Sequence, residues 1–82
     1  MTFDAVVTII KRSVIDVVHA KGLRPPELDA STDLMAGDFG LDSLDLATVI
    51  IAIEAETGID PFKSGFREFS SLGELAGFYV EA

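Results

Sequence analysis

The sequence contains no cysteine, and this absence removes several kinds of chemistry at once. The chain of 82 residues has no disulfide bond, no thiolate nucleophile and no thiolate metal ligand. Basic residues are also few: six lysines and arginines face fourteen acidic residues, and the net charge is −8. Because phosphate binding depends on lysine and arginine, we expect no nucleic-acid partner. Strong acidity suits partners with basic patches, or it only keeps the chain in solution; charge alone leaves both open.

Long apolar runs are absent too, so we expect no insertion into a membrane. The first residues, Met1 to Asp4, lack the basic start of a signal peptide, which favours a cytoplasmic protein. A chain of this length predicts one small domain over residues 1–82, expected to be a monomer. Such a domain has little room for both a core and a sculpted catalytic pocket, so binding or carrying is favoured over catalysis.

The first amphipathic stretch predicts a helix that begins after Thr2 and stops at Gly22. Its apolar residues recur at spacings of three and four, as one face of a helix requires: Phe3, Val6, Val7, Ile10, Val14, Val17 and Val18. Residues 23 to about 42 then predict a long loop, which Pro25-Pro26 opens. Loops of this length in small domains are often functional. Four apolar residues should pack this loop across the helices: Leu34, Met35, Phe39 and Leu41.

Two capping boxes mark the starts of two further helices. Asp42 with Asp45 opens a helix that runs to Gly58, and Ser71 with Glu74 opens the last one. Between them, residues 62–69 predict a short, irregular fourth helix. The expected fold class is therefore all-α: a small four-helix bundle of three main helices and one short helix, with a long loop between the first and second.

The segment from Phe39 to Leu46 carries the chemical signal, because it places Ser43 at the first turn of a helix. The first N–H groups of a helix lack intrahelical partners, and the helix dipole makes that end positive. A phosphate ester on an exposed Ser43 would therefore be stabilised there. A serine at a helix start usually only satisfies backbone groups. The acids on both sides of Ser43 and its place in a four-helix pattern favour the further role.

The triplet Asp42-Ser43-Leu44, preceded by Phe39-Gly40 and followed by an amphipathic helix, resembles the acyl carrier proteins. The resemblance spans nearly the whole chain. It implies that a phosphopantetheinyl transferase transfers 4′-phosphopantetheine from coenzyme A to Ser43. The thiol of that arm would hold an acyl group as a thioester in fatty acid, lipid or polyketide biosynthesis. Ser43 would be an attachment point in a non-catalytic carrier.

The resemblance also implies two surfaces. An acyl pocket between the later helices would be lined by Val49, Ile53, Ile59, Phe66, Phe69 and Leu75, although an ordinary core is the simpler interpretation for most of these residues. Acyl-transferring enzymes, ligases or synthases with basic or apolar patches would recognise Asp42, Leu44, Asp45, Ala47, Thr48, Ile51 and Glu54. Thr48, Ile51 and Ala55 occupy positions where members serving primary fatty acid synthesis are expected to carry two acids and an apolar contact residue, so a specialised pathway fits better.

Other interpretations have less support in the sequence. A serine hydrolase needs a base near Ser43, and the single histidine is His19, late in the first helix. Asp38, Asp42 and Asp45 lack the spacing of a calcium-binding loop, so no specific metal is expected. An aminoacyl or peptidyl carrier stays open, and so does a helical interaction domain without a prosthetic group.

Overall fold

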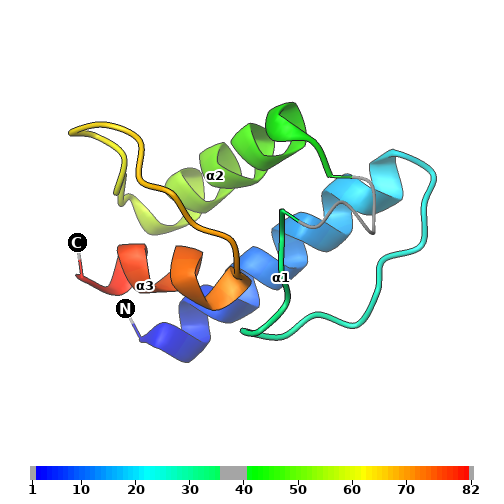
Figure 1. Ribbon diagram of the computed structural model, residues 1–82, viewed down its shortest axis with the longest axis horizontal. Coiled ribbons are helices and arrows are strands. Elements are labelled where there is room, and N and C mark those ends of the chain that lie inside the picture. Colours follow the sequence, from blue (N-terminus) through cyan, green and yellow to red (C-terminus); the bar gives the residue numbers. More distant parts are fainter. Residues whose placement is uncertain (1, 36–40, 82) are drawn as a thin grey trace.

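Three α-helices make up the regular structure in the part of the chain that the structure describes (Figure 1). The computed structural model describes residues 2–35 and 41–81. Helix α1 spans Phe3–Ala20, α2 spans Ser43–Thr57 and α3 spans Leu72–Glu81. The all-α class and the three main helices are thus confirmed. Helix α1 packs against both α2 and α3, whereas those two helices do not contact each other closely.

The helix ends follow the signals in the sequence. Thr2 caps α1 by accepting a hydrogen bond at its hydroxyl. Gly22 has a φ of 78°, and this left-handed conformation lets the N–H of Leu23 donate to the carbonyl of Val18 at 3.1 Å. Gly58 ends α2 in the same conformation, with a φ of 72°. Glycine suits both positions because a side chain would strain them.

The short fourth helix expected over residues 62–69 does not form. The chain makes two turns instead, in which the N–H of Lys63 faces the carbonyl of Asp60 at 3.4 Å and the N–H of Gly65 donates to the carbonyl of Phe62 at 3.0 Å. Gly65 has a φ of 132°, far from helical values, so a helix cannot continue through it. Residues 66–70 have no regular secondary structure.

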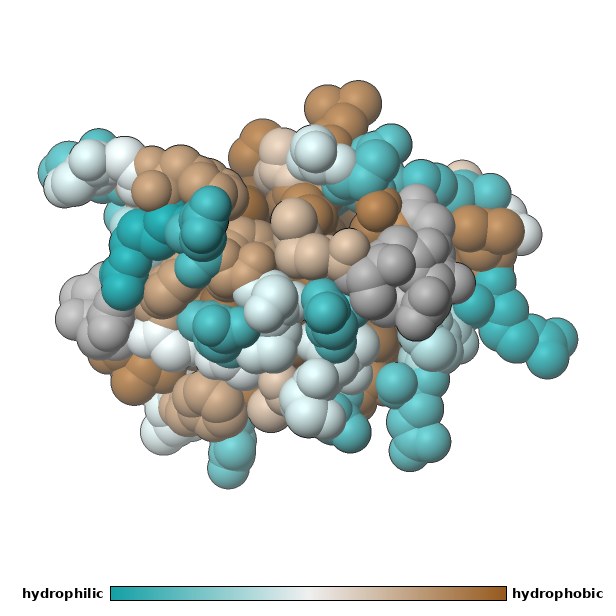
Figure 2. Space-filling view, in the orientation of Figure 1, coloured by the Kyte–Doolittle hydropathy of each residue, from teal (hydrophilic) through white to brown (hydrophobic). Residues whose placement is uncertain are grey.

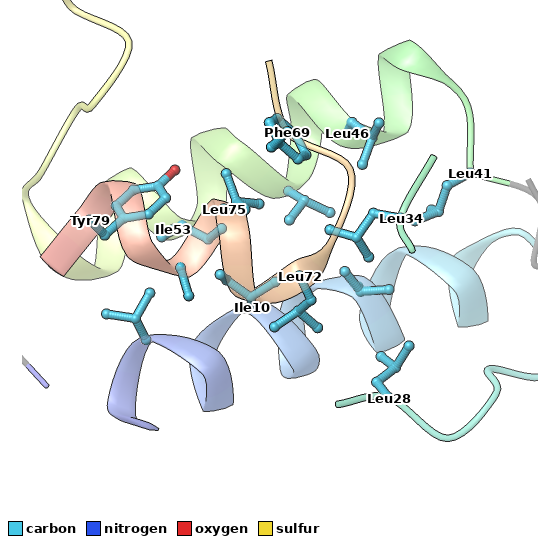
Figure 3. Close-up of a cluster of buried hydrophobic side chains, with 14 of the residues drawn as sticks. Ile10, Leu28, Leu34, Leu41, Leu46, Ile53, Phe69, Leu72, Leu75 and Tyr79 are labelled. Atoms are coloured by element: carbon cyan, nitrogen blue, oxygen red, sulfur yellow. The ribbon is translucent and has the colours of Figure 1, made fainter. Parts of the chain in front are cut away.

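The hydrophobic core lies where α1 faces the other two helices (Figure 3). Each helix contributes fully buried side chains, among them Ile10, Ile53 and Leu75. The long loop also enters the core, through the leucines Leu28, Leu34 and Leu41. Phe39, which was expected to pack with them, lies outside the described residues, as does Gly40. The loop is therefore part of the packed structure over its described residues.

The start of α3 holds the loop in place. The N–H of Leu34 donates to the carbonyl of Ser70 at 2.7 Å, and the N–H of Gly73 donates to the carbonyl of Ala30 at 2.8 Å. A Cβ atom at Gly73 would come within 2.8 Å of that same carbonyl oxygen. Glycine is therefore required for the close approach of loop and helix, and the loop is held close to the segment that follows α2.

Candidate functional site

Ser43 is exposed and is the first residue of α2. The predicted capping box around it is confirmed: the N–H of Asp45 donates to Asp42 Oδ1 at 2.9 Å, and the N–H of Asp42 donates to Asp45 Oδ2 at 3.1 Å. The N–H groups of Ser43 and Leu44 lie in the first turn, where helix geometry provides no intrahelical acceptor. The positive end of the helix dipole is therefore directed at this serine, and a phosphate ester fits there.

A lysine from another helix also reaches this end of α2. Lys21, the C-cap residue of α1, donates from Nζ to Asp45 Oδ2 at 2.5 Å. This hydrogen bond lowers the pKa of the Asp45 carboxyl and raises the pKa of Lys21. Sequence reasoning missed the pair, because helical periodicity carries no information about partners 24 positions apart.

An apolar groove opens beside Ser43. Its volume is about 340 Å³, near the lower end of the roughly 300–1,000 Å³ of small-molecule sites. Besides Ser43, its lining consists of apolar side chains from the loop, from α2 and from the segment after α2: Met35, Leu46, Ala47, Ile50, Ile51, Phe62, Phe66 and Phe69. In Figure 2, apolar side chains gather over α2 and the segment that follows it.

Contacts between phenylalanine rings build one wall of this groove. Phe62 stacks on Phe66 with ring centroids 5.6 Å apart, and it meets Phe78 of α3 edge-on at 5.9 Å. Phe69 contacts all three of these rings and is itself buried. The guanidinium of Arg67 lies 4.0 Å from the ring centroid of Phe78. These contacts join the four rings into one aromatic cluster, in which Phe66 is 71% exposed.

The six residues predicted to line an acyl pocket fall into two groups. Phe66 and Phe69 line the groove. Val49, Ile53 and Leu75 are fully buried in the core, and Ile59 is half-buried against it. Besides Ser43, the α2 residues that do line the groove are Leu46, Ala47, Ile50 and Ile51.

The residues predicted to contact partners lie mostly at the surface. Six of them are exposed: Asp42, Leu44, Ala47, Thr48, Ile51 and Glu54. Leu44 is 75% exposed and Ile51 is 66% exposed, which is high for large apolar side chains. The seventh residue, Asp45, is half-buried. Its carboxylate accepts hydrogen bonds from Lys21 and from the N–H of Asp42.

The rival chemistries gain no support from the described part of the chain. His19 is exposed in the last turn of α1. Over residues 2–35 and 41–81, no three histidine or carboxylate groups gather where they could hold a metal ion; Asp38 lies outside these residues. No helix in this part of the chain has both the length and the apolar character needed to cross a bilayer.

A protein-family model described as a phosphopantetheine attachment site matches residues 9–79. The match includes all of α2 and therefore Ser43 at its start. Searches of the curated proteins and of the solved structures each returned no significant match.

Proposed function

The chain belongs to the family of carrier domains with a phosphopantetheine attachment site, and from this premise we propose that it is an acyl carrier protein with the arm on Ser43. Domains of this family are non-catalytic carriers of 4′-phosphopantetheine. Their partners are a phosphopantetheinyl transferase and the enzymes that process the cargo. The group supplies the thiol that a cysteine-free chain lacks, and this thiol holds the cargo as a thioester.

The surroundings of Ser43 support it as the attachment point. Its hydroxyl belongs to an exposed residue at the positive end of α2, where backbone N–H groups stabilise a phosphate ester. Most other serines are committed elsewhere: Ser13 is buried, Ser31 bonds Asp29, and Ser70 bonds Glu74. Ser64 is exposed, but it lies in a turn and not at the start of a helix. Asp42 caps the helix through its own side chain, so Ser43 is not needed for capping.

The apolar groove beside Ser43 is the observation that favours an acyl cargo. Burying an aliphatic chain there contributes about 0.8 kcal/mol per fully buried methylene. An amino acid cargo would bring an ammonium group, whose desolvation in an apolar groove is unfavourable without a partner. An aminoacyl or peptidyl carrier is the alternative.

The exposed face of α2 supports docking through apolar contact. Leu44, Ala47 and Ile51 offer apolar surface next to Ser43, with Asp42 and Glu54 towards the two ends of the helix. Partner enzymes with an apolar docking patch and a few basic groups would fit this face. We place the carrier in a specialised branch of fatty acid, lipid or polyketide biosynthesis.

Intact-mass spectrometry tests the proposal. The protein is incubated with coenzyme A and a broad-specificity phosphopantetheinyl transferase, beside the variants Ser43→Ala and Ser64→Ala. Ser64 is an exposed serine in the turn after α2 and serves as the matched control. We expect one phosphopantetheinyl group on the wild type and on Ser64→Ala, and none on Ser43→Ala. Modification of a folded Ser43→Ala variant, as judged by circular dichroism, would refute Ser43 as the site.

A further inference from the structure

The two carboxylates that flank Ser43 have different surroundings. Asp42 is exposed, whereas the Asp45 side chain is 18% exposed and pairs with Lys21, whose side chain is 32% exposed. A second pair of the same kind joins Glu56 of α2 to Arg12 of α1. Cations on α1 thus neutralise two of the carboxylates that α2 carries.

We propose that Lys21 is a specificity-determining residue, because by pairing with Asp45 it keeps this carboxylate from attracting basic partner enzymes to the start of α2. The inference rests on the proposed carrier function and concerns how partners reach Ser43. Partner enzymes would then recognise the first turns of α2 mainly by their apolar surface.

The remaining charges on α2 agree with this assignment. Between Asp42 and Glu54 the exposed residues are uncharged: Ser43, Leu44, Ala47, Thr48, Ile51 and Ala52. At 1.5 Å of rise per residue, the twelve steps from Asp42 to Glu54 place these two acids about 18 Å apart along the helix. A basic partner therefore meets a mainly apolar stripe with an exposed acid only towards each end.

Lys21 offers a cleaner test than Asp45. Replacing Asp45 would remove the ion pair and also the capping box, because the same carboxylate accepts the N–H of Asp42. Replacing Lys21 by methionine keeps the long aliphatic side chain and leaves both capping hydrogen bonds in place. The variant removes the positive charge that faces Asp45 and, more weakly, Asp42.

The experiment measures kcat and KM for phosphopantetheinylation by a transferase with a basic docking face, across a range of salt concentrations. For Lys21→Met we expect KM to fall about twofold to fivefold at low salt, the range that corresponds to a surface ion pair, with kcat unchanged. High salt should remove the difference. Lys21→Arg should keep the wild-type KM, because it restores the cation.

Lys63→Met is the matched control, since Lys63 is exposed in the turn after α2 and its loss changes the net charge by the same single unit. A KM for Lys21→Met equal to that of Lys63→Met, or higher than that of the wild type, would overturn the inference. If no variant accepts the arm and the wild type does not either, the proposed function fails instead.

A second readout needs no transferase. Titration of the Asp45 carboxyl by NMR should give a pKa that rises towards its ordinary value in Lys21→Met and stays low in Lys63→Met and Lys21→Arg. An Asp45 pKa that is the same in Lys21→Met and in the wild type would mean that the pair does not form in solution, and it would overturn the inference independently of any enzyme.

Discussion

Acyl groups of increasing length on Ser43 are expected to stabilise the folded protein in steps, until the groove beside Ser43 is full. The groove is apolar and begins at Ser43, so a chain that folds back from the arm can exchange water for methyl, methylene and phenyl groups. The comparison is between the arm with a free thiol and the arm carrying butyryl, hexanoyl, octanoyl or decanoyl groups.

The size of each step follows from the geometry of the groove. Full burial of one methylene contributes about 0.8 kcal/mol; the groove is open on one side, so we count roughly half of that. Two added carbons then contribute about 0.8 kcal/mol in total. For a domain of this size, 1 kcal/mol shifts Tm by roughly 4–8 °C. Each two-carbon step should therefore raise Tm by about 3–6 °C, and the increase should end when the groove is filled.

Thermal unfolding followed by circular dichroism, on forms whose loading is verified by mass, measures this series. Ala47→Phe fills the groove from α2 and should flatten the rise, because Ala47 belongs to the lining. Ala52→Phe is the control, since Ala52 is exposed on the same helix and does not line the groove. A Tm that is independent of chain length, or a rise of equal slope in the two variants, would refute the reasoning.

Three further predictions concern stability. Gly73→Ala should lower the free energy of unfolding by about 1–3 kcal/mol, because the new Cβ atom would meet a backbone carbonyl oxygen. Gly77 has open space around it, so Gly77→Ala should raise the free energy of unfolding by about 0.5–1 kcal/mol. Equal effects of the two substitutions in urea unfolding would contradict this prediction. Hydrogen bonds, first from the N–H of Ser71, lower the pKa of Glu74 from 4.5 to about 2, so its contribution is present above pH 4.5 and is lost as pH falls through about 2. Glu74→Gln should therefore flatten the acid side of a Tm-against-pH curve, and an unchanged curve would count against the capping box as the cause. Tyr79→Phe should raise the free energy of unfolding by about 1 kcal/mol, because the buried hydroxyl has no hydrogen-bond partner among the described residues. Burial raises the pKa of Tyr79 to about 12, so the wild type, unlike Tyr79→Phe, should lose stability as pH rises from about 10 through about 12. If Tyr79→Phe were less stable than the wild type at neutral pH, the hydroxyl would have a hydrogen-bond partner after all.

Signals that act within a few residues made the helices predictable. A capping side chain such as Thr2 or Asp42 bonds to the backbone three positions later, and a glycine such as Gly58 sets its own φ. These effects do not depend on the rest of the fold. The start of α2, and with it the exposed position of Ser43, could therefore be read from the sequence.

Features that depend on packing between distant segments could not be predicted from such local signals. On this part of α2 the groove is lined by Ile50 and Ile51, which lie between the predicted and fully buried Val49 and Ile53. Which of these neighbours faces inwards depends on how α2 is rotated against α1. The expected fourth helix does not form, because Gly65 adopts a φ of 132°, which lies outside the helical range.

Helix α2 is apolar on more than one face. For this reason its buried face is hard to predict from the sequence, and the same property bears on the proposed function. One stripe, Leu46, Val49 and Ile53, is buried in the core, while Leu44 and Ile51 stay largely exposed. Exposed apolar surface of this kind marks a place that something else covers. Ile51 belongs both to the lining of the groove and to the exposed face next to Ser43. Under the proposed function, a partner enzyme that docks on Ile51 touches the mouth of the groove, so docking and withdrawal of the cargo are expected to be coupled through this one side chain.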